Sequence, residues 1–176
     1  MSETTASPSR ANPFWDFSLK LYASPAVQAA CLELQDNSGV DVNVLLYMLW
    51  NGANRRQLGR EGAKAVLDAV EAWRTDVVVP LRTARRNLKQ PPPAIDAAAA
   101  VTLRAIVKKA ELEAERLQQA ALFALELPTT SVAGVREAGE ANARAYGSAL
   151  GRPLAAAPLG VMLDALESLT TASPPI

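Results

Sequence analysis

The sequence predicts an all-α protein, a bundle of six or seven helices in a single domain. Hydrophobic residues make up 49% of the 176 residues and aromatic residues only 5%, so alanine, leucine and valine supply most of the apolar content. Alanine and leucine favour helix over strand. Apolar residues also recur at steps of three and four, with glycine and proline between the runs. A chain of this length can bury about 70% of its unfolded surface, enough for one core.

Two short helices are expected first. Residues 1–11 contain almost nothing that could pack, and we interpret them as a disordered N-terminal tail before a helical domain at 12–170. An asparagine–proline pair at 12–13 predicts the start of a helix that ends near residue 23. A serine–proline pair then opens a second helix, which should stop at Gly39.

The third helix is expected to form the buried centre. Asp41 is a candidate N-cap, and the segment that follows it, VNVLLYMLWNG, leaves almost no polar face. A helix that is apolar all round is typical of a protein core. A β-strand is the competing interpretation for so short an apolar run, but its leucines, its methionine and Asn43 favour helix.

A fourth helical segment is expected from Gly62 to Val79. Pro80 should either kink this helix or start a new one, because proline cannot donate the backbone hydrogen bond. Three consecutive prolines at 91–93 then predict a stiff extended connection that divides the chain into two halves.

The second half should begin with a long helix over residues 94–127. As one helix it would be about 50 Å long, so it should break or protrude from a domain of this size. Two weaker helices follow at residues 132–150 and 158–169, the last expected to pack loosely, before a C-terminal tail at 171–176. The expected core stripe of the long helix consists of Leu103, Ile106, Val107, Ala110, Ala114, Leu117 and Ala121.

Composition limits the partners and the compartment. Basic and acidic residues balance at 18 each, so nucleic acid, anionic lipid or an acidic substrate would need a local patch. Cys31 is the only cysteine, which excludes an intrachain disulfide and favours a reducing cytoplasm. The sequence has no apolar run long enough for a signal peptide or a membrane span.

Most familiar catalytic chemistry has no residues to perform it. The chain contains no histidine, which excludes imidazole bases, histidine-dependent triads and histidine-ligated metals. No glycine-rich phosphate loop is present, and the glycine of the loop Asp36–Asn43 has the wrong spacing for a calcium site. We therefore expect no catalytic residue, no metal and no cofactor.

One resemblance is visible in the first half of the chain. The residues that carry it are F14-W-x-F-S-L-x-L-Y22, P25-x-V-x-x-x-C31-L-x-L-Q-D36 and G39-x-D-V-N43-x-L-L-x-x-L-W50. This pattern resembles a proteobacterial family of small helical proteins of unknown function. The resemblance implies a bacterial cytoplasmic protein and brings no particular activity with it.

Two groups of polar residues are candidate sites. The first is basic and lies at helical steps that place at least three of its side chains on one face, where an anion, a nucleic acid or an acidic protein surface could bind: Arg82, Arg85, Arg86 and Lys89. The second could line a polar pocket or only cap helices and face solvent: Asp36, Asp41, Asn43, Glu111 and Glu115.

The function we expect is that of a non-enzymatic accessory or regulatory module, which binds an unknown protein partner through the basic helix or the long helix. The alternative is an enzyme or small-molecule binder with an internal polar pocket, to which Arg82 would also contribute. A partner face would leave the arginines exposed, whereas a pocket would direct them onto the carboxylates around a cavity.

Overall fold

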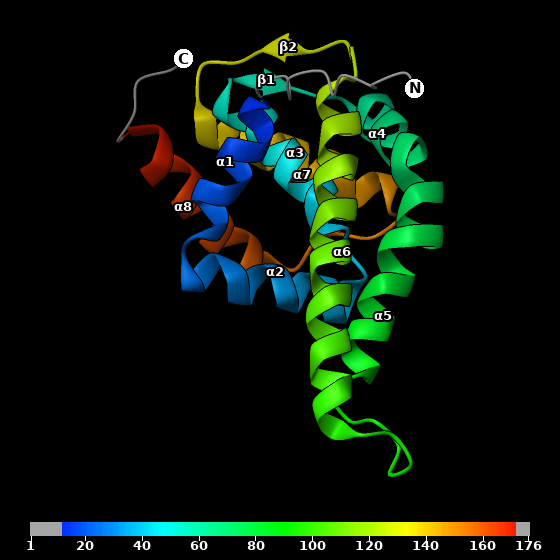
Figure 1. The fold of residues 1–176 in the computed structure, drawn as a ribbon. Coiled ribbons are helices and arrows are strands. Elements are labelled where there is room, and N and C mark those ends of the chain that lie inside the picture. Colours follow the sequence, from blue (N-terminus) through cyan, green and yellow to red (C-terminus); the bar gives the residue numbers. More distant parts are fainter. Residues whose placement is uncertain (1–11, 172–176) are drawn as a thin grey trace, which may run out of the picture.

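The computed structural model describes residues 12–171 and shows an all-α bundle (Figure 1). These residues form eight α-helices: α1 (Pro13–Tyr22), α2 (Pro25–Ser38), α3 (Val42–Ala53), α4 (Arg60–Trp73), α5 (Val79–Asn87), α6 (Ala97–Phe123), α7 (Val135–Ala149) and α8 (Ala156–Thr171). A five-residue π-helix, η1 (Arg74–Val78), joins α4 to α5. Because α4, η1 and α5 follow one another without a break, the described residues form seven continuous helices. This confirms the predicted fold class.

The predicted starts of α1 and α3 and the predicted end of α2 are confirmed. The Asn12 side chain accepts a hydrogen bond from the Trp15 amide at 3.1 Å. The Asp41 carboxylate accepts from the amide of Asn43 at 2.9 Å and that of Val44 at 3.3 Å. Gly39 ends α2 with φ +56°, a left-handed conformation that glycine adopts without strain.

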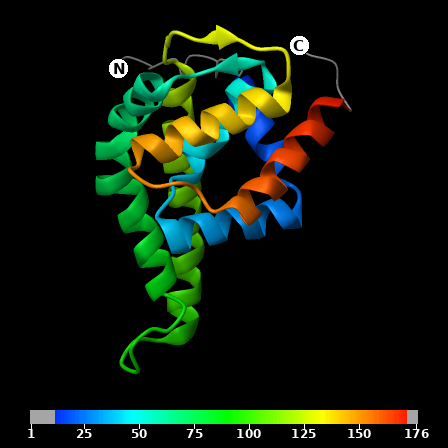
Figure 2. The same ribbon diagram turned by 180° about the vertical axis from the view of Figure 1, so that it is seen from behind.

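Helix α3 forms the centre of the bundle, as predicted, and the strand interpretation is wrong. It lies between α6 on one side and α7 on the other (Figures 1 and 2). Helices α3 and α7 cross closely at Gly52 and Gly139. The approach is so close that a Cβ atom on Gly52 would lie only 2.8 Å from the Cα of Gly139. Two glycines at one crossing therefore allow the backbones to approach.

Asn142 of α7 ties this centre to the loop after α3. Its Nδ2 donates to the carbonyl oxygens of Met48 at 3.0 Å and Arg56 at 2.8 Å, and its Oδ1 accepts from the Leu58 amide at 2.6 Å. The same loop contains the two-residue strand β1 (Arg56–Gln57), which pairs antiparallel with β2 (Thr130–Ser131). The sequence analysis did not predict these strands.

Pro80 does not break the chain into separate helices. Helix α4 continues through η1 into α5, with the Val79 amide bonded to the carbonyl of Arg74, five residues earlier. The π turn widens the helix just before Pro80, where the proline ring would crowd an ordinary α-helical turn.

Helix α6 is continuous and protrudes. Its 27 residues span about 40 Å, and its first half extends beyond the body of the bundle together with α5 (Figures 1 and 2). The predicted core stripe is mostly wrong, since Leu103, Ile106 and Leu117 are exposed. The buried face is largely polar or small: Ala100, Glu111, Ala114, Gln118, Gln119 and Leu122.

Helix α8 packs more tightly than expected. Met162, Leu163 and Leu166 are all fully or almost fully buried in the main core cluster, and α8 packs on α2 and α7. Few apolar residues suffice here because they fall on one face. None of the helices between residues 12 and 171 combines the length and apolar character needed to cross a membrane.

Candidate functional site

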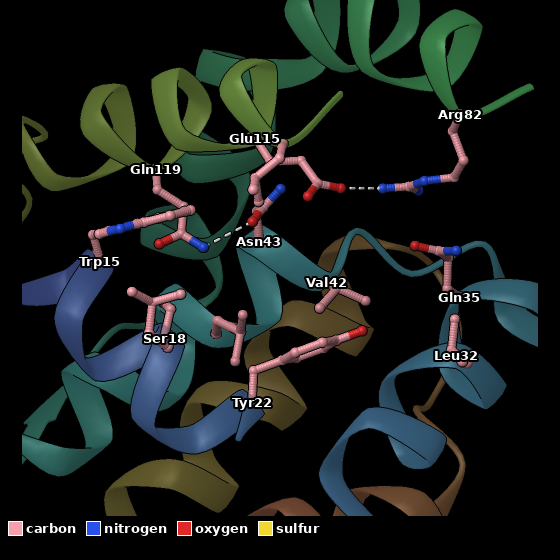
Figure 3. Close-up of a pocket in the computed structure, with 13 residues that line it drawn as sticks. Trp15, Ser18, Tyr22, Leu32, Gln35, Val42, Asn43, Arg82, Glu115 and Gln119 are labelled. Atoms are coloured by element: carbon pink, nitrogen blue, oxygen red, sulfur yellow. Dashed lines mark hydrogen bonds and ion pairs between the residues drawn. The ribbon is translucent and has the colours of Figure 1, made fainter. Parts of the chain in front are cut away.

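A pocket of about 160 Å³ opens between α1, α2, α3, α5 and α6 (Figure 3). The first half of α6 extends beyond the bundle, and the second half packs against α1 and α3. The pocket lies where this second half meets the other helices. Seven apolar or aromatic side chains line it: Trp15, Leu19, Tyr22, Leu32, Val42, Leu46 and Leu112. Six polar side chains complete the lining: Ser18, Gln35, Asn43, Arg82, Glu115 and Gln119.

The rim of the pocket is apolar and exposed. Leu19 of α1 is 52% exposed, Leu32 of α2 is 50% exposed and Leu112 of α6 is 53% exposed, while Tyr22 is 37% exposed. We call these four residues the apolar rim. Single exposed leucines are common on protein surfaces, but a group of them around one pocket is typical of a binding surface.

One wall of the pocket is an ion-pair cluster. Arg82 of α5 bonds to Glu115 at 2.7 Å and to Glu111 at 3.2 Å, so it bridges two carboxylates one helical turn apart on α6. Arg85 contacts Glu111 as well, including an Nη2–Oε1 hydrogen bond of 3.1 Å. The repulsion expected between two glutamates at this spacing is thus offset by the arginines.

The two glutamates differ in their acidity. Burial raises the pKa of Glu115, and the hydrogen bond and charge of Arg82 only partly oppose this effect. Burial also disfavours the charged form of Glu111, but its hydrogen bonds and charge interactions with Arg85 and Arg82 outweigh that effect and lower its pKa. The carboxyl that lines the pocket is therefore the weaker acid.

The floor of the pocket rests on a buried chain of amides that starts at Asp41. Gln118 Nε2 donates to Asp41 Oδ2 at 2.7 Å, and Asn43 Nδ2 donates to Gln118 Oε1 at 3.1 Å. Gln119 Nε2 then donates to Asn43 Oδ1 at 2.8 Å. These four residues, which we call the amide relay, are all at least 94% buried. Gln119 Oε1 is buried and has no hydrogen-bond partner among the described residues.

Asp41 is fixed from the opposite side as well. Its amide donates to the phenol oxygen of Tyr146 at 2.9 Å, and Arg74 Nε lies 3.5 Å from its Oδ2. The carboxylate thus caps α3 with one oxygen and anchors the amide relay with the other.

The structure brings most of the sequence-predicted residues together. Asn43, Glu115 and Arg82 line the pocket, and Asp41, Glu111 and Arg85 lie directly behind it. Arg86 and Asp36 instead pair with each other at 2.7 Å on the surface, each about half exposed. Lys89 is exposed and forms no ion pair within residues 12–171.

Sequence reasoning missed Gln118 and Gln119, which carry the amide relay. The available signal was their spacing along the helix. Gln118 follows Glu111 by seven residues and Gln119 follows Glu115 by four, so each pair lies on one side of α6. We assigned the apolar stripe to the core instead, since buried helix faces are usually apolar.

Cys31 is a core residue, as expected. Its Sγ lies 4.0 Å from the Met162 Sδ, and burial raises the pKa of the thiol to about 12. No group of three or more histidine, cysteine or acidic residues in the described part of the chain could hold a metal ion.

Comparison with protein families identifies the family of this chain. The model of a family described as "protein of unknown function (DUF2390)" matches residues 13–122, more than half of the chain. The chain belongs to the DUF2390 family. Every residue that lines the pocket lies inside the matched region, whereas α7 and α8 lie outside it. No curated protein and no solved structure matches the chain.

Proposed function

We propose that the protein is a non-enzymatic interaction module, which binds a segment of a partner protein by taking one of its apolar side chains into the pocket. The observation that carries this proposal is the apolar rim around a small pocket with a polar floor. Interface hot spots are commonly single large side chains that fill such pockets, surrounded by contacts that exclude water.

The size of the pocket favours a side chain over a cofactor. Its volume is about 160 Å³, whereas sites for drug-sized ligands usually enclose roughly 300–1,000 Å³. A small molecule inside the pocket would also leave Leu19, Leu32 and Leu112 facing water. A protein segment lying across the mouth would cover them and would gain hydrophobic free energy from their burial.

The alternative function, an enzyme or small-molecule binder, uses the same pocket. Its support is the convergence of Arg82 and Glu115 on one cavity, with a raised pKa for the glutamate. Ion pairs within folded proteins produce such shifts too, and both groups already have partners. The exposed rim therefore weighs more heavily for the interaction module.

The basic helix has less support as the binding surface. Arg82 and Arg85 face glutamates of α6, and Arg86 faces Asp36, so three of the four candidate cations are neutralised within the chain. An anionic ligand or nucleic acid would have to displace these carboxylates. The long helix, in contrast, supplies Leu112, Glu115 and Gln119 to the pocket.

The test is selection of peptides from a random display library on the full chain, followed by affinity measurement on two variants. Leu32→Glu places a charge in the apolar rim, and Val101→Glu does the same on α6 at a side chain that is 67% exposed and outside the pocket. We expect selected peptides to share an apolar anchor and to bind Leu32→Glu at least about tenfold more weakly than wild type or Val101→Glu.

Equal binding to Leu32→Glu and wild type would refute the proposed surface. A thermal-shift screen of metabolites distinguishes the alternative function, an enzyme or small-molecule binder, from the interaction module. A small molecule whose stabilisation of wild type disappears in Leu32→Glu, combined with a failed peptide selection, would favour the enzyme or small-molecule binder.

A further inference from the structure

We infer that the pocket selects an anchor side chain that combines an apolar ring with a hydrogen-bond donor, the indole N–H of tryptophan in particular. This inference rests on the proposed function, since it names the chemistry of the partner at the same site. It follows from the direction in which the amide relay is forced to run.

The direction of the amide relay is set at Asp41. An ionised carboxylate has acceptors only, so the Gln118 group that faces it at 2.7 Å must be the NH₂. The Gln118 oxygen then faces Asn43 and requires its NH₂, and the Asn43 oxygen requires the NH₂ of Gln119. Each amide orientation is thus fixed by the one before it, and no amide can be turned over alone without opposing two donors or two acceptors.

The relay therefore ends on an acceptor at the pocket. Gln119 lines the pocket, is only 3% exposed, and its Oε1 has no hydrogen-bond partner among the described residues. Figure 3 shows this oxygen pointing away from Asn43, on the side of the pocket where Trp15 and Ser18 lie. A buried acceptor without a donor is unfavourable, so a ligand that supplies the donor gains more than an apolar ligand of the same shape.

The neighbouring polar groups support a neutral donor. Glu115 is already bonded to Arg82, and the Ser18 hydroxyl donates to the carbonyl of Phe14 at 2.9 Å. An anionic anchor would meet the carboxylate of Glu115, and a purely apolar anchor would leave Gln119 Oε1 unpaired. An aromatic ring with one N–H matches both the apolar walls and the buried, unpaired acceptor Gln119 Oε1.

Two small probes test the inference on the full chain. N-acetyl-tryptophanamide carries the indole N–H, and the corresponding 3-benzothienylalanine derivative has almost the same shape with sulfur in place of the N–H. Affinities are measured by NMR titration, which also locates the bound probe. We expect wild type to bind the indole probe about tenfold more tightly, as expected for one buried hydrogen bond. Gln119→Met, which removes the acceptor at similar volume, should bind both probes equally.

Equal binding of the two probes to wild type would overturn the inference, and so would binding of neither probe or shifts centred away from Trp15 and Gln119. The comparison on wild type needs no variant, so a folding defect in Gln119→Met would not weaken the test. The proposed function is judged separately by the peptide selection. Peptides with an apolar anchor and no donor, bound at the pocket, would support that function while refuting this inference.

Discussion

Replacement of Asp41 by asparagine should reverse the amide relay. The side-chain oxygen of the introduced asparagine would still cap α3, since asparagine is as good an N-cap as aspartate. Its NH₂ would then face Gln118, which must turn over to present an oxygen. Asn43 and Gln119 must turn over in sequence, because each faces the group before it. The pocket would end on a donor in place of an acceptor.

Comparison of Asp41→Asn with Asp41→Ala separates the contribution of the hydrogen bonds from that of the negative charge. Asp41→Asn loses a negative charge at the start of α3, worth roughly 0.3–1 kcal/mol, and a partly exposed contact with Arg74, worth roughly 0.2–1 kcal/mol. The expected loss is about 1 kcal/mol. Asp41→Ala also removes the cap and leaves Gln118 Nε2 without an acceptor, which adds roughly 1–3 kcal/mol for the buried donor alone. We expect a total loss of about 4 kcal/mol for the alanine variant.

Urea unfolding measures both losses, and the two probes measure the direction of the relay. Asp41→Asn should lose the preference for the indole probe over the benzothienyl probe while it keeps most of the native stability. The reasoning is refuted if Asp41→Asn retains the indole preference, or if its loss of stability equals that of Asp41→Ala. The second result would mean that the three amides cannot turn over together.

Four further predictions concern the core and the ion-pair cluster. Asn142→Leu removes three buried hydrogen bonds, including the one that the Leu58 amide donates, so the free energy of unfolding should fall by about 3 kcal/mol; a fall below about 1 kcal/mol in urea unfolding would contradict this. Glu111→Gln should cost more stability at pH 7 than at pH 3, because the lowered pKa of Glu111 makes its ionised form stabilise the fold above the unfolded pKa. Glu115→Gln should show the opposite trend, because the raised pKa of Glu115 means that the fold favours its neutral form; parallel pH profiles for the two variants would rule out this assignment. The Cys31 thiol, with a pKa of about 12, should react with a thiol reagent at mildly alkaline pH only after denaturation, and rapid reaction of the native protein would show that the core is open.

The helix ends and the central helix could be predicted because their causes are local. Asn12 and Asp41 bond to amides within three residues along the chain, and Gly39 adopts its left-handed conformation at the end of its own helix. Helix α3 is apolar on nearly every face, so its burial required no knowledge of its neighbours.

The burial of α6 could not be predicted in the same way. The helix presents an apolar stripe and a polar face, and the usual rule buries the apolar one. In this bundle the polar face of α6 bonds to Asp41 and Asn43 at the N-terminal end of α3 and to two arginines of α5. These bonds replace the ones that the polar side chains would otherwise make to water. Leu103 and Ile106 lie on the exposed side as a result.

The sequence by itself determined the all-α class, the caps, the central helix and the residue types available for a site. Only the tertiary structure decided which of them meet, because contacts such as Arg82–Glu115 and Gln118–Asp41 join residues 33 and 77 positions apart. Hydrogen-bond direction along the amide relay likewise depends on the packing of α6 against α3. The feature that carries the proposed specificity, one buried acceptor at the floor of an apolar pocket, therefore exists only in the folded chain.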